Sequence, residues 1–373
     1  MNKLRMENFT RLTDGQNFVF LDSMEDLVRI RDINGEILFE NRAMRELIRV
    51  VLRKSESQND ISKFFIELYE NCKKERGSFR REITIDGRIY AVKASPIYDS
   101  MGNVQAFIEV FRDISLERRI TRQLYQTTKR TNDDILLAKT IQESILPTKK
   151  EYGNLHFDFC HVASENLSGD IYDVIEISED RVGVYIADVV GHGISASIIT
   201  MFIRQSMRSI LQENPNLSAS DTVLKLKESF RQLDLEISQY FTIIYILIDK
   251  KEKKMSYVNG GHNGFPIFFN KKNVGFLHNS GKFISNLFED VEYNENVIDL
   301  NIGDRILLYT DGLTETCDAK GNFFGEKRLI NWVRKNRKAK NFVQKLLHDV
   351  DNFRARSQND DIAIVYLEIK ETN

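Results

Sequence analysis

The spacing of apolar residues predicts short strands and one helix in residues 17–115, after an N-terminal arm of residues 1–16. The strand-like runs are separated by turn-forming residues such as Asp86-Gly87, which is typical of a meander of hairpins. The helix is predicted where apolar residues recur three and four positions apart. It covers residues 41–52, and the strands that follow cover residues 78–85, 88–98 and 104–112.

Residues 116–150 form a second segment, in which neither proline nor glycine occurs before Pro147. A 4-3 spacing predicts a coiled-coil seam, and the polar middle of that seam would permit a shift or a twist. We expect a parallel dimeric helix that links two domains, although a surface helix packed on its own chain gives the same pattern. The seam positions are Ile120, Leu124, Thr127, Thr131, Asp134, Ala138, Ile141 and Ile145.

In residues 151–373, many strand-like runs alternate with helical stretches. Two helices are predicted early, at residues 195–213 and 220–240, and the first has an apolar face. Ser220-Asp221 is expected to cap the second of them. Many strands with paired helices between them indicate an α+β sandwich. Later helices are predicted at residues 326–335 and 341–353.

The composition suits a globular protein of the cytoplasm. The 373 residues are 42% hydrophobic and 29% charged, and a formal net charge of −2 gives no reason to expect nucleic-acid or membrane binding. No apolar run has the length of a membrane span, and the N-terminus lacks the apolar stretch of a secretory signal. Cys72, Cys160 and Cys317 are odd in number and far apart, which predicts a reducing compartment.

Four short acidic motifs, spread over nearly 200 residues, are the strongest indication of chemistry. At least three lie where an apolar run meets a turn, as Asp188 does after residues 182–187. Several carboxylates at neighbouring strand ends would bind a hard divalent cation, and two such ions can activate water against a phosphate ester. The motifs are Ser168-Gly169-Asp170-Ile171-Tyr172-Asp173, Asp188-Val189-Val190-Gly191-His192-Gly193, Tyr309-Thr310-Asp311-Gly312 and Asn359-Asp360-Asp361-Ile362.

Residues 131–367 resemble the PPM-type (protein phosphatase 2C-like) bacterial serine phosphatases of the RsbU/SpoIIE group. The resemblance rests on the order and approximate spacing of the four motifs and of several shorter ones. It implies two packed β-sheets flanked by helices, two Mn²⁺ or Mg²⁺ ions, and hydrolysis of phosphoserine or phosphothreonine. The shorter motifs are residues 138–147, Gly191-His192-Gly193 with Ala196, Gly260-Gly261-His262-Asn263, Gly303-Asp304, residues 310–315 and residues 321–325.

The resemblance also implies which residues hold the metals. Asp188 would bridge the two ions, and the backbone carbonyl of Val189 would add a ligand. Asp170 would bind one ion, and Asp311 and Asp360 the other. Gly169 and Gly191 have no side chain and would let the backbone approach closely at the site. Four further residues are expected to support the ligands from behind or to contact waters bound to the metals. They are Gly169, Asp173, Asp361 and His192.

The two histidines of the motifs are weaker candidates. His192 lies four residues after Asp188, so it could contact substrate or donate a proton, but a lone histidine is more often hydrogen-bonded to a backbone carbonyl. His262 is expected to shape a turn. Two positions depart from the family pattern. Ser168 stands where many relatives have glycine. The family often has a second glycine soon after the one at Gly281, and this chain has Lys282-Phe283-Ile284-Ser285 there instead. The latter loop could alter substrate docking.

Residues 17–115 resemble a PAS sensor domain, so the whole chain has an RsbP-like arrangement. The segment ends with Phe111-Arg112-Asp113-Ile114-Ser115, like the last strand and cap of that family. It contains no histidine, which excludes a haem held by an axial histidine. Cys72 does not lie in a flavin-binding context. An apolar core that transmits a signal or dimerises is the favoured interpretation, and a small apolar or carboxylate ligand is the alternative.

The nearest relatives imply a phosphorylated STAS-type anti-sigma-factor antagonist as substrate, in a partner-switching pathway that releases a sigma factor. A homodimer through the PAS segment and the linker follows from the same resemblance, and a protein activator is compatible with it. A PAS-linked histidine kinase would need a phosphoacceptor histidine, and residues 116–150 contain none. A diguanylate cyclase would need Glu-Phe after Asp170. A sensor or scaffold with a catalytically weak phosphatase fold is the remaining alternative, against which the complete acidic set argues.

Regulation of the metal site by the linker is a further hypothesis. A signal at the PAS segment would shift the weak seam, and residues 138–147 would then move the two helices predicted after Asp188. Repacking of these helices would complete or break the metal site as a two-state gate.

Overall fold

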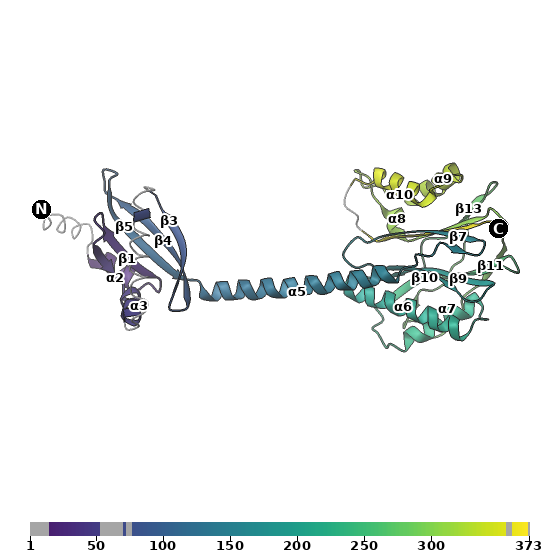
Figure 1. Cartoon of the computed structure of the whole chain (residues 1–373), viewed down its shortest axis with the longest axis horizontal. Helices are drawn as coiled ribbons and strands as arrows, with labels where there is room; N and C mark the ends of the chain where they lie inside the picture. The colour runs from purple at the N-terminus through teal and green to yellow at the C-terminus, as the bar shows by residue number, and fades with distance from the viewer. Residues whose placement is uncertain (1–14, 53–69, 72–76, 356–359, 372–373) are drawn as a thin grey trace. The chain divides into compact units, whose positions relative to one another are not determined.

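The computed structural model describes residues 15–52, 70–71, 77–355 and 360–371 of the chain (Figure 1). The chain divides into two compact units, Met1–Arg130 and Thr131–Asn373. Helix α5 (Ser115–Ile145) crosses the boundary between them. Within the described ranges, we find no helix with both the length and the apolar character of a membrane span. Cys72 and Asn359 lie outside those ranges.

An antiparallel sheet of order β2-β1-β5-β4-β3 forms the centre of the N-terminal unit. Met44 of helix α3 is fully buried in an apolar cluster with Leu27 and Phe111 of this sheet. The predicted helix and the predicted meander of strands are confirmed to within one residue at each end. The elements are α2 (Gly15–Asp22), β1 (Leu27–Asp32), β2 (Ile37–Glu40), α3 (Arg42–Leu52), β3 (Phe79–Ile85), β4 (Arg88–Tyr98) and β5 (Val104–Asp113).

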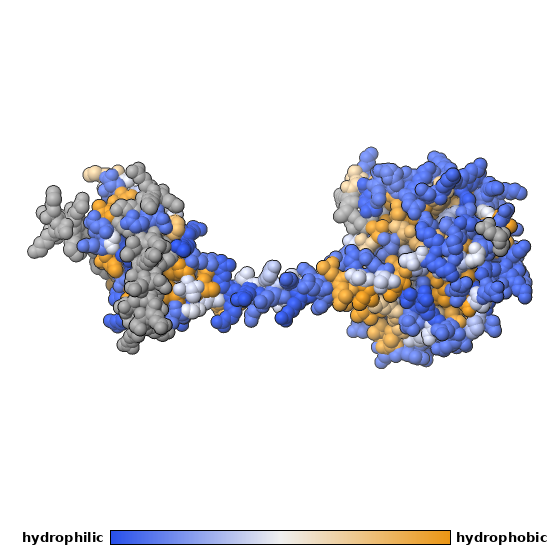
Figure 2. Space-filling model, viewed as in Figure 1, coloured by the Kyte–Doolittle hydropathy of each residue, from blue (hydrophilic) through white to orange (hydrophobic). Residues whose placement is uncertain are grey.

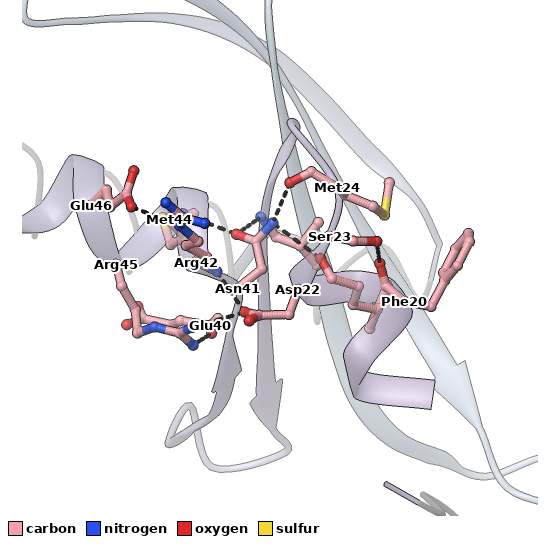
Figure 3. Close-up of polar contacts among 12 residues, drawn as sticks. Phe20, Asp22, Ser23, Met24, Glu40, Asn41, Arg42, Met44, Arg45 and Glu46 are labelled. Atoms are coloured by element: carbon pink, nitrogen blue, oxygen red, sulfur yellow. Dashed lines mark hydrogen bonds and ion pairs between the residues drawn. The ribbon is translucent and has the colours of Figure 1, made fainter. Parts of the chain in front are cut away.

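The side chain of Asn41 joins the start of α3 to the segments around it (Figure 3). Its Oδ1 accepts hydrogen bonds from the N–H groups of Val28 (3.0 Å) and Met44 (2.9 Å). Its Nδ2 donates to three backbone carbonyls between residues 21 and 26. Because Asn41 is fully buried and its amide is hydrogen-bonded on both sides, it caps α3 and fixes the connection between α2 and β1.

A cluster of buried charges lies on the face of this sheet that packs against α3. Arg29 donates from Nε to Glu40 Oε1 (2.8 Å), and Arg31 Nε lies 3.4 Å from Glu109 Oε1. Burial raises the pKa of Glu109, and the positive charge of Arg31 opposes that rise. The core that was expected to be apolar therefore contains two ion pairs.

Helix α5 carries the predicted seam, and hydrophilic residues cover its middle (Figure 2). The seam residues Ile120 and Leu124 are more than half exposed, whereas Ile145 packs against the core of the C-terminal unit. Apolar residues also gather on the surface of that unit around the end of α5 (Figure 2). The exposed seam would accommodate a second helix, and the coiled-coil dimer stays a prediction.

Two β-sheets pack face to face in the C-terminal unit. Among the described residues, one sheet has the order β15-β11-β10-β9-β8 with β14 paired to β10, and the other has the order β13-β12-β16-β17-β7-β6. Apolar side chains such as Ile186 and Val365 fill the space between them. The first sheet contains β8 (Asp170–Glu176), β9 (Arg181–Val189), β10 (Tyr240–Asp249), β11 (Lys254–Gly260), β14 (Ile284–Ser285) and β15 (Asn296–Asp299). The second contains β6 (Glu151–Tyr152), β7 (Leu155–Val162), β12 (Ile267–Phe269), β13 (Val274–Phe276), β16 (Arg305–Tyr309) and β17 (Ile362–Ile369).

Helices cover the outer face of each sheet (Figure 1). On the first sheet lie α6 (Ile194–Glu213) and α7 (Ala219–Arg231), which bury Met207 and Phe230 against it. The predicted α+β sandwich of two sheets flanked by helices is confirmed by this arrangement. On the second sheet lie α8 (Asp311–Glu315), α9 (Gly325–Asn336) and α10 (Phe342–Phe353).

The helix predicted at residues 220–240 is wrong at its far end and in its cap. The side chain of Ser218 accepts a hydrogen bond from the N–H of Asp221, so Ser218 rather than Ser220 caps α7. The helix ends at Arg231, and a short loop then leads into β10.

Candidate metal centre

Asp170 and Asp188 lie opposite each other at one end of the first sheet. Asp170 is the first residue of β8, and it is the register partner of Asp188 near the end of β9. Side chains alternate along a strand, so both residues project from the same face as Tyr172 and Ile186, which belong to the core between the sheets. The two carboxylates therefore point toward the second sheet.

The second sheet supplies the other two predicted ligands at its strand ends. Strand β16 leads into Asp311, the first residue of α8, and Asp360 lies just before β17. Between them, Thr310 donates a hydrogen bond from Oγ1 to Asp170 Oδ2 (2.7 Å) and accepts one from the N–H of Ala363 (2.9 Å). Thr310 therefore joins the two halves of the site.

The surroundings of the site raise the pKa values of three of the four aspartates. Burial, followed by the charges of Asp311 and Asp360, raises the pKa of Asp188 to about 7. Burial, followed by the charge of Asp188, raises the pKa of Asp170 well above its ordinary value. Burial also raises the pKa of Asp360. A divalent cation would stabilise the charged forms that these surroundings disfavour.

The all-oxygen chemistry of the site fits Mg²⁺ or Mn²⁺ and gives no soft ligand for Zn²⁺. Across the described part of the chain, no three histidine, cysteine or acidic side chains are already drawn together as a ligand cage. Mg²⁺ is usually held by one or two carboxylates and keeps several of its waters. The residues therefore fit ions that are bound by few direct carboxylates and completed by water.

Asp361 accepts four hydrogen bonds from the loop that precedes Asp170. Its Oδ1 accepts from the N–H and the hydroxyl of Ser164 (2.7 and 2.9 Å). Its Oδ2 accepts from the hydroxyl of Ser168 and from the N–H of Gly169 (both 2.7 Å). Both oxygens are engaged by the loop, so Asp361 holds the loop in place behind the other carboxylates.

Gly169 occurs where the backbone leaves no room for a side chain. A Cβ at this position would lie 3.0 Å from the carbonyl oxygen of Val189. The N–H of Val189 in turn donates to the carbonyl oxygen of Gly169 (3.1 Å). The backbone of Val189 therefore approaches Gly169 closely. Gly191 has open space around it, and its φ of 90° is the reason that a glycine suits this position.

The structure places Asp173 away from the other carboxylates, which corrects the expectation that it supports them. Asp173 lies three residues after Asp170 in β8, so the two side chains project from opposite faces of the sheet. Asp173 is fully buried and accepts hydrogen bonds from Nε and Nη2 of Arg208 (2.7 and 2.9 Å). Arg204 Nε lies 3.6 Å from the same carboxylate. Asp173 therefore fastens α6 to β8.

The two candidate histidines have different surroundings. His262 is buried and donates from Nε2 to the carbonyl oxygen of Tyr309 (3.0 Å), so its Nδ1 accepts from the hydroxyl of Thr242 (2.9 Å). Burial lowers the pKa of His262, which keeps the ring neutral at pH 7 and gives it a structural role. His192 is exposed, and its Nδ1 lies 3.2 Å from Glu165 Oε2.

Glu315 and Gln142 had no role in the sequence prediction. Glu315 lies four residues after Asp311 on α8, and burial, followed by the charges of Asp311 and Asp360, raises its pKa. The sequence signal for Glu315 is its i, i+4 spacing from Asp311, which places the two side chains on the same face of the short helix. Gln142 lies on α5 and contacts the loop before Asp170, and no local pattern distinguishes it from the other polar residues of that helix.

The chain is similar to a known protein family and to two phosphoserine phosphatases. The family model for Stage II sporulation protein E (SpoIIE) matches residues 178–370, a little over half of the chain, and this range includes three of the four aspartates. Phosphoserine phosphatase RsbP of Bacillus subtilis (strain 168) is 33% identical over 186 residues, which are 50% of this chain and 46% of RsbP. Phosphoserine phosphatase RsbU of the same organism is 23% identical over 257 residues, which are 68% of this chain and 74% of RsbU.

A solved structure shares the fold of the C-terminal unit. The SiaA-PP2C domain of Pseudomonas aeruginosa superposes with a TM-score of 0.57 at 19% identity, over 65% of this chain and 98% of that domain. The chain spans less than half the length of RsbP, so the likeness to RsbP concerns one part of each protein. The match to the family model extends over more than half of the chain, and the chain therefore belongs to the SpoIIE family.

Proposed function

We propose that the C-terminal unit is a metal-dependent protein phosphatase that hydrolyses phosphoserine and phosphothreonine. The observation that carries this proposal is the meeting of four aspartates from two sheets at one edge, where burial and repulsion raise the pKa values of three of them. The likeness to RsbP and RsbU, which are phosphoserine phosphatases, supports the same reaction.

Each of the four aspartates has a distinct place in this proposal. Two Mn²⁺ or Mg²⁺ ions, when bound, would lower the pKa of a shared water and neutralise charge on the phosphoryl group. Asp188 would lie between the ions. Asp170 would hold one of them through Oδ1, because its Oδ2 accepts the hydrogen bond of Thr310. Asp311 and Asp360, which follow and precede strands of the other sheet, would hold the second ion.

The test is phosphate release from a phosphoserine protein by the full chain, as a function of Mn²⁺ concentration. We expect hydrolysis that requires the metal, stops when EDTA is added, and is much slower when the same substrate carries phosphotyrosine. A folded chain that binds Mn²⁺ but releases no phosphate from any phosphoserine substrate would contradict the proposal. Equal hydrolysis with and without EDTA would contradict the metal requirement.

We further propose that the substrate is a phosphorylated STAS-type anti-sigma-factor antagonist in the cytoplasm. This substrate class is what the resemblance of the sequence motifs to the RsbU/SpoIIE group implies. The chain would act as a homodimer through its N-terminal unit and α5, and the exposed seam of α5 supports this arrangement. The N-terminal unit would act as the sensor.

We also propose that α5 gates the metal centre through Gln142. The side chain of Gln142 is buried, and its Oε1 accepts a hydrogen bond from the N–H of Ser168 (3.0 Å). Its Nε2 donates to the carbonyl oxygen of Ser168 (2.8 Å) and to the hydroxyl of Thr200 on α6 (3.1 Å). A shift of α5 would therefore break or restore the contacts that hold the Gly169-Asp170 loop.

Gln142→Ala is expected to lower the phosphatase rate and to raise the Mn²⁺ concentration needed for half-maximal rate. The substitution leaves the buried N–H and carbonyl of Ser168 without their partner, which costs about 1–3 kcal/mol, or roughly fivefold to 150-fold in a rate or binding constant. A Mn²⁺ titration of the initial rate measures both effects.

The matched control for Gln142→Ala is Gln126→Ala, which removes an exposed amide from the same helix. We expect Gln126→Ala to behave as the wild type. Equal Mn²⁺ titration curves for the two variants, with both folded by circular dichroism, would remove the case for a gate at Gln142.

A further inference from the structure

Three aromatic rings form a ledge at the end of the first sheet where Asp188 lies. We define the aromatic ledge as Tyr240, Phe283 and Phe288. The ring centroids of Tyr240 and Phe283 are 4.6 Å apart, and those of Phe283 and Phe288 are 5.1 Å apart. All three residues are only partly buried, so the ledge presents apolar surface to solvent.

The aromatic ledge lies on the same face of the sheet as the metal centre. Thr242 is the register partner of Asp188, and Tyr240 lies two residues before Thr242 in β10. Residues two apart in a strand project from the same face, so Tyr240, Thr242 and Asp188 face the same way. Strand spacing places Tyr240 roughly 8 Å from Asp188. The N–H of Val190 also donates to the carbonyl oxygen of Tyr240 (3.1 Å), which ties the two strand ends together.

The backbone holds the aromatic ledge in a fixed position. Strand β14 pairs with the start of β10, with Ser285 opposite Tyr240. Phe283 packs so closely over Gly261 that a Cβ there would lie 2.5 Å from the Phe283 nitrogen. Asn286 Nδ2 donates to the carbonyl oxygen of Leu235 (2.8 Å), which fastens the loop after β14 to the loop before β10. The rings are therefore preorganised, which lowers the entropic cost of binding.

The surroundings of the aromatic ledge suit a polypeptide that carries a phosphate. Leu287 and Ile237 are 52% and 59% exposed, so the two loops joined above also present apolar side chains to solvent. Lys282 is exposed, and its Nζ lies 4.8 Å from the ring centroid of Phe288, so the rim of the ledge carries a cation. Aromatic residues with an apolar surround are typical of protein recognition sites.

We propose that the aromatic ledge binds an apolar side chain one or two residues from the phosphoserine of the protein substrate. This inference rests on the proposed phosphatase function. Neighbouring residues of an extended peptide are about 3.4 Å apart along the chain. A substrate whose phosphoserine reaches Asp188, and whose chain runs along β10 toward Tyr240, would place a residue one or two positions away over the ledge.

The test uses two synthetic phosphoserine peptides that differ only beside the phosphoserine, with leucine residues in one and glycine residues in the other. We expect the wild-type chain to prefer the leucine peptide by about tenfold in kcat/KM, mainly through KM, because burying one such side chain on an aromatic surface is worth about 1.4 kcal/mol. Phe283→Ala is expected to reduce this preference to about threefold or less.

Each outcome of this test has a distinct meaning. Wild-type hydrolysis of both peptides at equal kcat/KM would overturn the docking role and leave the phosphatase proposal standing. No hydrolysis of either peptide, nor of p-nitrophenyl phosphate, would overturn the phosphatase proposal itself. A full preference that survives in both Phe283→Ala and Phe288→Ala would also overturn the docking role. Ile302→Ala removes an exposed apolar side chain near the start of β16, away from Asp311, and is expected to keep the wild-type preference.

Discussion

Asp188→Asn is expected to lower the metal-dependent phosphatase rate by about three orders of magnitude, which corresponds to a loss of about 4 kcal/mol of transition-state stabilisation. Asp188 faces carboxylates of both sheets, and in the proposed mechanism it lies between the two ions. An amide keeps the shape of the side chain but removes its negative charge. Initial rates of phosphate release at saturating Mn²⁺ measure the effect.

The same substitution is expected to stabilise the metal-free chain at neutral pH. The folded chain keeps a proton on Asp188 up to about pH 7, whereas the unfolded chain releases it near pH 4. The folded state therefore binds the extra proton between these values, and its stability falls as pH rises through that interval. Asparagine has no such proton, so Asp188→Asn is expected to be more stable than wild type by about 2–4 kcal/mol at pH 8 and to lose that advantage near pH 4.

Thermal unfolding in EDTA at pH 5 and pH 8 measures this difference. The control is Asp180→Asn, which changes an exposed carboxylate in the turn at the other end of β8 and β9. Asp180→Asn is expected to match the wild type in rate and in pH dependence. A variant at Asp188 that keeps its phosphatase rate, or that is less stable than wild type at pH 8, would show that this carboxylate is not the centre of the site.

Gly312→Ala is expected to destabilise the chain by about 3 kcal/mol and to lower the phosphatase rate at least about 100-fold. A Cβ at Gly312 would lie 1.9 Å from the carbonyl oxygen of Asp361 and 2.9 Å from its carbonyl carbon. These are backbone atoms, so no rotamer change can relieve the contact. Helix α8, which begins at Asp311, would have to separate from the segment just before β17, which contains Asp360.

Chemical denaturation and phosphate release measure the two effects of Gly312→Ala. The control is Gly275→Ala in β13, where a Cβ would meet nothing within 4 Å. We expect the control to change stability by less than about 1 kcal/mol. A Gly312→Ala chain with wild-type stability and rate would mean that the approach of α8 to β17 does not set the position of the two aspartates.

Some of this site could be predicted from the sequence because it lies at strand ends. Asp188 and Asp311 each follow an apolar run, and such runs are buried strands whose ends are fixed by local pattern. Asp173 was misplaced, although the period of two along a strand already puts it on the face opposite Asp170. The motif continues into β8, so its two aspartates lie on opposite faces of the strand and do not belong to one site.

Other parts of the site depend on contacts that no local pattern encodes. Gln142 reaches Ser168 across 26 positions of the sequence, and Thr310 reaches Asp170 across 140. The predicted end of α7 is wrong because apolar positions continue past Arg231 into the loop and β10. Periodicity alone therefore does not indicate where the helix stops. Register, caps and long-range hydrogen bonds therefore required the structure.

The place of β17 in the second sheet has a consequence for biosynthesis. This strand lies between β16 and β7, and β7 precedes it by about 200 residues. A nascent chain thus carries Asp170 and Asp188 long before the strand that completes their surroundings leaves the ribosome. Pairing over such a separation is slow, because the loop must close before the contacts form. We expect catalytic competence to appear only after β17 has paired with β7 and β16, so that a product that stalls before β17 is inert toward phosphoproteins.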